Sequence, residues 1–264
     1  MSLTLSLILA AQMGNVKPTD AKAPRPVADQ SVPARYRGKL VLNKPKGITE
    51  KVIALTFDDG PDPVNTPRLL NILDKYNAKA TFFVIGSYAT HHMGVVTETH
   101  RRGHVVANHT WSHKARPAQS AAKGEIERTS ALIKKATGRT PTLFRPPYGI
   151  RNNATTKVAM AQGYPIVLWN RISADTARNA TINNIAYNVL SLASPGDIVL
   201  FHDGPGKKKT IDAVPRILAA LQKKGYRFVT IPEMLAIWDA HEAKRKAPTD
   251  KKATATPKPA AKKS

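Results

Sequence analysis

Side chains that bind metals and transfer protons recur in five short segments of this 264-residue chain. Two adjacent aspartates open the series, and two histidines four positions apart follow them. An arginine, a further aspartate and a third histidine stand in the later segments. In order, the segments are Thr-Phe-Asp-Asp-Gly-Pro at 56–61, His-Thr-Trp-Ser-His at 109–113, Arg-Pro-Pro-Tyr-Gly at 145–149, the residues around Asp175, and Leu-Phe-His-Asp at 200–203.

One carboxylate and the two paired histidines have the composition of a metal site. Asp59, His109 and His113 would form a two-histidine, one-carboxylate set, because histidines four residues apart can meet one ion from a single helical turn. A water molecule could bind at an open position on such an ion, and the ion would lower the pKa of that water toward about 7. The alternative is structural, since Asp-Gly-Pro is an ordinary turn sequence and the histidines could be ordinary polar residues on a helix or loop.

The other charged residues could divide the proton transfers of a hydrolysis. With Asp59 on the metal, Asp58 is free to take a proton from the bound water. Arg145 could pair with Asp58 and fix its orientation, or could belong to a buried structural ion pair. His202 could protonate a leaving group while Asp175 holds its other ring nitrogen, or could be a hydrogen-bonded core histidine.

The elements that must position these residues alternate between strands and helices. Such alternation predicts a parallel sheet with crossover connections, and the length of residues 51–239 favours a closed or nearly closed barrel. No glycine-rich dinucleotide fingerprint follows the first strand. The five segments lie at or shortly after strand ends, where such barrels carry their chemistry. The predicted strands are 52–57, 80–85, 104–107, 142–144, 165–169, 197–201 and 227–230, and the predicted helices are 68–76, 90–102, 125–137, 154–162, 181–193, 211–224 and 232–238.

Taken together, the five ordered motifs resemble those of the polysaccharide deacetylase family (NodB homology, carbohydrate esterase family four). The resemblance covers roughly residues 51–238. It implies a distorted (β/α)7-type barrel and an enzyme that removes acetyl groups from N-acetylglucosamine polymers. One motif departs from the family pattern, because Thr176 follows Asp175 where members usually carry tryptophan. The loss of that aromatic wall affects sugar stacking or pocket shape rather than metal chemistry, and Trp111 could replace part of it or could serve only in packing.

The resemblance also implies a role for each motif residue. It implies a divalent cation, usually zinc, and a carboxylate base that is oriented by an arginine. It further implies a general acid held by an aspartate, and a backbone donor to the oxyanion. In this chain the roles fall on Asp58 as base, Asp59, His109 and His113 as metal ligands, Arg145 as the residue that orients the base, His202 as acid with Asp175 as its partner, the backbone N–H of Tyr148 as oxyanion donor, Pro147 and the Tyr148 ring as sugar-site lining, and Leu200 as the wall of the acetyl pocket.

Composition limits the setting in which this chemistry could operate. The formal net charge is +23, and the absence of cysteine excludes disulfides and thiolate metal sites. The basic residues carry no recognisable nucleic-acid motif, so no specific nucleic-acid partner is expected. We divide the chain into a signal-like segment and Pro/Lys-rich linker at 1–50, a catalytic domain at 51–239 and a basic low-complexity tail at 240–264.

Both ends of the chain bear on the location and substrate of the protein. Residues 1–11 resemble the apolar part of a secretory signal without its basic start, so we expect export. The N- and C-terminal tails are expected to be disordered, and the C-terminal one is either simply solvated or adheres to an anionic envelope. Peptidoglycan is therefore the preferred substrate. Chitin oligosaccharides are the alternative, and a non-catalytic envelope-binding module is the competing class; no oligomeric state is assigned.

Overall fold

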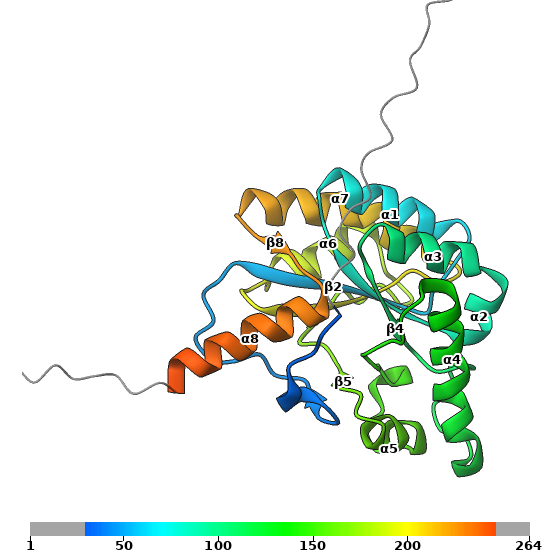
Figure 1. Ribbon diagram of the computed structural model, residues 1–264. Helices are drawn as coiled ribbons and strands as arrows, with labels where there is room; N and C mark the ends of the chain where they lie inside the picture. Colours follow the sequence, from blue (N-terminus) through cyan, green and yellow to red (C-terminus); the bar gives the residue numbers. More distant parts are fainter. Residues whose placement is uncertain (1–29, 247–264) are drawn as a thin grey trace, which may run out of the picture.

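The computed structural model describes residues 30–246, and parallel strands form its centre (Figure 1). Five strands pair in the order β4-β3-β2-β7-β6, and β8 pairs with the beginning of β2. Beyond β4, single bridges through Phe144 lead to β5, which pairs with β1. The strands are β1 (Leu40–Val41), β2 (Val52–Asp58), β3 (Ala80–Val84), β4 (Val105–Asn108), β5 (Ile166–Val167), β6 (Arg171–Ile172), β7 (Asp197–His202) and β8 (Arg227–Phe228).

This arrangement is the distorted barrel of parallel strands that the sequence predicts. Among the described residues no strand pairing joins β6 to β1, so the sheet stays open there. Helices follow most strands, as crossover connections between parallel strands require. They are α1 (Asn65–Lys75), α2 (Gly86–His91), α3 (Met93–Arg101), α4 (Ala122–Thr137), α5 (Ala154–Ala161), α6 (Ile182–Leu190), α7 (Lys208–Lys223) and α8 (Ile231–Lys246).

Alternate side chains of β2 pack into two different cores. Ile53, Leu55 and Phe57 join the cluster under α1, α6 and α7, and Phe57 stacks between two further phenylalanines at 5.3 Å. Val52 and Ala54 face the other way, into a cluster that α8 covers (Figure 1). Burying a side chain of this size contributes about 1.5–3 kcal/mol, so both faces of β2 fix its register. Asp58 continues the second row and therefore faces the barrel interior.

The register of the strands sets which chemical groups become neighbours. Asp58 pairs with His202 across β2 and β7, while Val84 of β3 pairs with Asn108 of β4. The backbone N–H of Arg145 donates to the Asn108 carbonyl at 3.1 Å. The carboxyl ends of β2, β4 and β7 and the loop after Phe144 therefore meet at one rim.

Several predicted boundaries change in the structure. The single helix expected at 90–102 is two helices, α2 and α3, and the strand expected at 142–144 reduces to the bridge residue Phe144. The predicted stop at Gly138 is confirmed, because this residue ends α4 in the left-handed conformation at φ 73°. The first helix begins at Asn65 and α4 at Ala122, each three residues earlier than expected.

Residues 30–46, which we expected to be part of a linker, are instead built into the domain. Val41 is 2% exposed and pairs with Val167 of β5. Lys44 reaches the buried Asp197 at 2.6 Å. At the other end, α8 carries the chain to Lys246, past the expected start of the basic tail. Residues 1–29, with the signal-like segment, and 247–264 lie outside the described residues.

None of the helices within residues 30–246 has the length and apolar character needed to cross a bilayer.

Candidate active site

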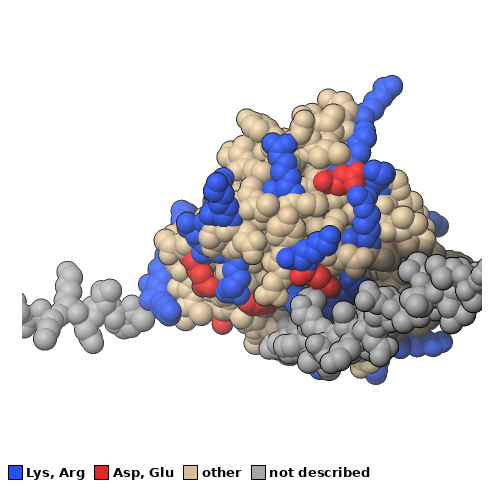
Figure 2. Space-filling view, turned by 90° about the horizontal axis from the view of Figure 1, so that it is seen from above, with Lys and Arg blue, Asp and Glu red and all other residues tan. Residues whose placement is uncertain are grey.

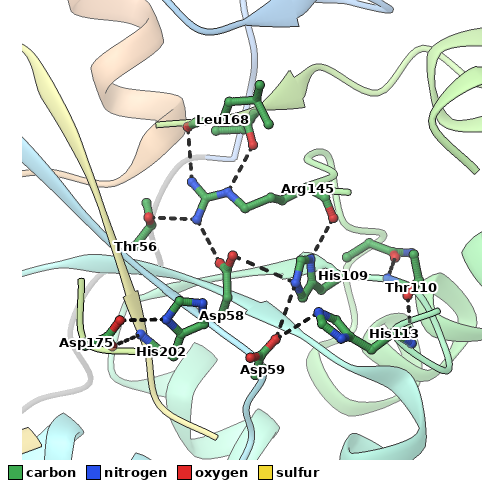
Figure 3. Close-up of polar contacts among 12 residues, drawn as sticks. Thr56, Asp58, Asp59, His109, Thr110, His113, Arg145, Leu168, Asp175 and His202 are labelled. Carbon is green, nitrogen blue, oxygen red and sulfur yellow. Dashed lines mark hydrogen bonds and ion pairs between the residues drawn. The ribbon is translucent and has the colours of Figure 1, made fainter. Parts of the chain in front are cut away.

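Three parallel strands deliver ionisable side chains to the rim. Asp58 is the last residue of β2, His109 follows β4 directly, and His202 ends β7. Asp59 comes one residue after β2 in the left-handed conformation, at φ 71°. This conformation is uncommon for a residue with a side chain, although aspartate tolerates it better than most. The sharp turn sets two adjacent carboxylates on different sides of the site (Figure 3).

Asp59, His109 and His113 converge as a set of metal-ligand atoms. One ligand atom from each lies within 4.8 Å of the other two. The Nε2 atoms of His109 and His113 are 3.5 and 3.2 Å from Asp59 Oδ1, a buried atom that makes no hydrogen bond. The Arg145 carbonyl lies 2.7 Å from His109 Nδ1, so that nitrogen can donate and leave Nε2 unprotonated toward the other ligands. These residues fit a divalent cation, since an orphaned carboxylate oxygen and two imidazole nitrogens face one point.

Charge in this set favours the forms that bind a metal. Burial by itself would raise the pKa of Asp59, but His109, followed by His113 and His202, lowers it to about 2. Burial and the neighbouring His109 lower the pKa of His113, against the opposing effect of Asp59. An ionised carboxylate beside a neutral imidazole is the state that a divalent cation requires.

From the spacing of the two histidines we expected them to lie on one helical turn. In the structure they lie on a loop instead. Residues 109–113 follow β4 as an irregular segment in which Thr110 and His113 have φ values of 68° and 55°. The two imidazole rings lie 4.9 Å apart. We call residues 109–113 the histidine loop. Its left-handed residues allow both rings to lie close together without helical periodicity.

Arg145 lies beneath Asp58 and is fully buried. Its guanidinium donates to Asp58 Oδ1 at 2.7 Å and to the Thr56 hydroxyl at 2.8 Å (Figure 3). It also donates to the carbonyls of Val167 and Leu168. Four acceptors hold the guanidinium in one orientation, and the charge-assisted bond to Asp58 in turn holds that carboxylate. The pairing predicted from the sequence is therefore present.

His202 faces the site from β7, with Asp175 behind it. The Nδ1 atom of His202 is 2.9 Å from Asp175 Oδ1, and the backbone N–H of His202 donates to Oδ2 at 2.8 Å. The Thr210 hydroxyl also donates to Oδ2. Burial lowers the pKa of His202, but the Asp175 carboxylate outweighs burial and leaves that pKa raised above its ordinary value. The predicted partnership of the two residues is present, and His202 Nε2 is left to face the site.

Tyr148 stands at the mouth of the site. It has φ 57° and an exposed fraction of 68%, and its ring lies 4.8 Å from the His113 ring. Pro147 is buried beside it, and Leu200 on β7 is 7% exposed. A cleft of about 360 Å³ opens here; its lining includes Asp59, Tyr88, His113, Tyr148 and Lys207.

The family pattern places a tryptophan after the aspartate that corresponds to Asp175, and this chain has Thr176 there. The structure shows which aromatic side chains line the cleft in its absence. Trp111 is half-buried and packs against Arg128, whose guanidinium lies 3.8 Å over its ring, and the residue is not part of the cleft lining. Thr176 is exposed. The exposed rings that line the cleft belong instead to Tyr88 and Tyr148.

Sequence reasoning missed a buried aspartate behind the rim. Asp203 is 1% exposed, accepts a hydrogen bond from the Thr66 hydroxyl at 2.6 Å, and leaves its Oδ1 atom without a partner. Burial raises the pKa of this carboxyl to about 7, although the Thr66 hydrogen bond opposes the shift. A Cβ on Gly60 would lie 2.6 Å from Asp203 Oδ1, so the residue packs directly under the turn that follows Asp59. Its place next to His202 was the available signal.

The chain is similar to known deacetylases in both sequence and structure. It matches the family described as polysaccharide deacetylase over residues 46–167. It is 40% identical to a peptidoglycan-N-acetylglucosamine deacetylase of Bacillus cereus over 191 residues, or 70% of this chain and 89% of that protein. It is 33% identical to a chitooligosaccharide deacetylase of a Bradyrhizobium species, over 69% of this chain and 90% of that protein.

A solved structure shares the fold as well. The crystal structure of the Bc1960 peptidoglycan N-acetylglucosamine deacetylase superposes with a TM-score of 0.70 at 33% identity. The match covers 76% of this chain and 94% of that one. The similarity therefore spans the barrel and the rim on which the site is built.

Proposed function

This chain belongs to the polysaccharide deacetylase family, whose metal-dependent enzymes remove N-acetyl groups from polysaccharides, and we propose that its substrate is peptidoglycan and its metal zinc. The observation that carries the proposal is the convergence of three features around one cleft. The first is the set of metal-ligand atoms from Asp59, His109 and His113. The other two are the Asp58–Arg145 ion pair and the His202–Asp175 pair. The reaction is hydrolysis of the acetamide C–N bond, which yields acetate and a glucosamine residue.

Zinc suits the donor atoms that Asp59, His109 and His113 offer. Two imidazole nitrogens and one carboxylate oxygen are a common protein ligand set for catalytic zinc, which keeps a further position open. When bound, the cation supplies Lewis acidity that polarises the acetyl carbonyl and lowers the pKa of a coordinated water toward about 7. The absence of cysteine leaves histidine and carboxylate as the side chains that can supply such a site.

Asp58 is assigned as the general base. Its carboxylate is 3% exposed and is fixed by Arg145 at 2.7 Å, while its Oδ2 lies 3.8 Å from His109 Nε2. It therefore stands beside the ligand set without belonging to it. From this position it accepts the proton of the water that attacks the acetyl carbon. Arg145 orients the base and compensates its charge, and the bonds from Arg145 to two carbonyls prevent it from swinging toward the substrate.

The backbone N–H of Tyr148 is assigned as a donor to the oxyanion. Removing one such donor typically costs about 3 kcal/mol of transition-state stabilisation. Leu200 would form the apolar wall against the acetyl methyl group, and Pro147 with the Tyr148 ring would contact the sugar. These assignments agree with the exposure of the Tyr148 ring and with the position of Leu200 on β7, two residues before His202.

His202 is assigned as the general acid. It donates its Nε2 proton to the departing nitrogen as the C–N bond breaks. Asp175 accepts from Nδ1 and favours the protonated ring, which is consistent with the raised pKa of His202. The base and the acid occupy neighbouring strands at paired positions, so both can reach one tetrahedral centre.

Peptidoglycan is preferred over chitin because the cleft carries basic groups. Lys207 lines the cleft, and Arg151 lines a second pocket that Tyr148 also borders. Neither side chain has an ion-pair partner within residues 30–246. Peptidoglycan carries carboxylates that chitin lacks, and these would pair with such groups. Lys and Arg side chains also outnumber acidic ones on the face shown in Figure 2, which would favour contact with an anionic envelope after export.

The test is acetate release from peptidoglycan and from chitin oligosaccharides in parallel, after chelation and again after zinc is added. The proposal expects zinc-restored release with higher kcat/KM on peptidoglycan. His113→Ala should abolish the restoration. His91→Ala is the matched control, because His91 is exposed on α2 outside the ligand set and should leave release unchanged.

Each other result points to a stated alternative. Higher kcat/KM on the oligosaccharides would favour a chitooligosaccharide deacetylase. If zinc binds but neither polymer releases acetate, the proposed reaction on these substrates is wrong. Wall binding without acetate release would then favour the non-catalytic envelope-binding module.

A further inference from the structure

The histidine loop is held in place by one carboxylate on α4. Glu125 Oε2 accepts from the backbone N–H groups of Trp111 and Ser112, at 2.9 and 2.8 Å. Glu125 Oε1 accepts from the Ser112 hydroxyl at 2.7 Å. A single side chain therefore satisfies three donors from two consecutive residues of the loop. These two residues lie between His109 and His113, which supply two of the three ligand atoms in the proposed metal site.

The backbone of the loop needs such support. Thr110 and His113 both lie in the left-handed region, which disfavours residues with a Cβ. Asn108 Oδ1 accepts from the Thr110 N–H, and the Thr110 hydroxyl accepts from the His113 N–H. These bonds fix the two ends of the turn. The donors in its middle, on Trp111 and Ser112, depend on Glu125, and without its carboxylate they would lack an acceptor inside the fold.

The Trp111 side chain joins the same support. The Arg128 guanidinium, one turn after Glu125 on α4, lies 3.8 Å over its ring. The ring also approaches Gly86, where a Cβ would come within 2.6 Å of it. The N–H of Gly86 donates to the Thr110 carbonyl at 2.9 Å. The middle of the loop is thus clamped between α4 and the start of α2.

We propose that Glu125 is a positioning residue for the metal centre, which presets His113 for the cation by fixing the backbone of the histidine loop. The inference rests on the proposed metal site. Glu125 contacts no ligand side chain and acts through the intervening backbone. Groups that hydrogen-bond directly to metal ligands typically affect metal affinity by about 10–100-fold, and we take this range as the scale for Glu125, which acts on the ligands through one short backbone segment. The other acidic residue of α4 offers a comparison, because Glu127 is exposed and pairs with Lys123 on the surface.

The experiment measures zinc affinity by competition with a chromophoric chelator for wild type, Glu125→Ala, Glu125→Gln and Glu127→Gln. We expect Glu125→Ala to weaken zinc binding about 10–100-fold. Glu125→Gln should fall between Glu125→Ala and wild type, because its amide keeps one acceptor oxygen for the backbone donors. Glu127→Gln should bind zinc as wild type does. The melting temperature of the metal-free proteins reports whether each variant is folded.

Acetate release gives a second readout. Glu125→Ala should lose activity at limiting zinc and recover most of it at saturating zinc, so that the defect lies in loading and not in the chemical step. Unchanged zinc affinity in folded Glu125→Ala would overturn the proposal, as would equal losses in Glu125→Gln and Glu127→Gln. Zinc affinity is measured without substrate, so a wild-type protein that binds zinc but releases no acetate refutes the proposed function alone.

Discussion

Replacement of Arg145 by methionine tests whether the guanidinium compensates the buried charge of the catalytic carboxylate of Asp58. The guanidinium is completely buried and donates to Asp58, to Thr56 and to two backbone carbonyls. Methionine has a similar length but carries no donor. The variant would therefore leave Asp58, itself 3% exposed, as a buried carboxylate without its charged partner.

The magnitude follows from that burial. Removing one partner of a buried ion pair costs about 3–5 kcal/mol, because the other charge is left uncompensated. For a domain of this size each kcal/mol lowers the melting temperature by about 2–4 °C, which gives a fall of about 6–20 °C. A surface pair behaves differently. Arg68→Met breaks the partly exposed pair with Asp212 and should cost less than about 1 kcal/mol.

The assay is urea unfolding of metal-free wild type, Arg145→Met, Asp58→Asn and the double variant, with Arg68→Met as control. In the double variant neither charge is left unpaired. We therefore expect it to be less destabilised than the sum of the two single variants, by about 1 kcal/mol or more. Strict additivity, or a loss of less than about 0.5 kcal/mol in Arg145→Met, would refute the claim that Arg145 compensates the buried charge of Asp58.

Two further predictions concern pH and substrate charge. The Asp175 carboxylate raises the pKa of His202, and this residue must be protonated to act as the acid. Asp175→Asn should therefore move the alkaline limb of the pH profile of kcat to lower pH. An unmoved limb would argue against His202 as the acid. Lys207→Gln should lower kcat/KM about 2–5-fold on peptidoglycan fragments with free carboxylates and leave neutral chitin oligosaccharides unaffected. Equal effects on both, or an effect that survives high salt, would contradict charge pairing at Lys207.

Much of the fold could be predicted because the apolar runs along the chain indicate the strands, and the rules for parallel sheets then indicate how the strands are arranged. The runs that become β2 and β3 are buried over their whole lengths, and β7 is buried up to its last residue, so their hydrophobic continuity was visible in the sequence. Parallel strands end at one rim, and this rule alone grouped Asp58, His109 and His202 before any distance was known.

The features that escaped prediction depend on contacts between distant residues. β1 is two residues long in a basic, proline-containing stretch, and only its pairing with β5 makes it a strand. The spacing of His109 and His113 fits a helical turn, but hydrogen bonds that backbone N–H groups of the loop donate to Glu125 and Asn108 favour a loop. The spacing of the two histidines carries no information about Glu125, because that residue lies outside the histidine motif.

The buried Asp203 illustrates the same limit. Its neighbour His202 was identified by its place at a strand end, while Asp203 points the other way, toward Thr66 and the turn at Gly60. Alternation along a strand end decides which of two adjacent polar residues faces the cleft. That alternation could be applied to β7 only after its last residue was known.

The central claim is that Asp58 acts as the base beside a metal site to which it does not belong. The most direct test is acetate release by Asp58→Asn on peptidoglycan, with bound zinc measured in the same sample. We predict that zinc stays bound and that turnover falls about 10²–10⁴-fold, the usual contribution of a positioned base. Turnover near the wild-type level with zinc bound would contradict the assignment of Asp58.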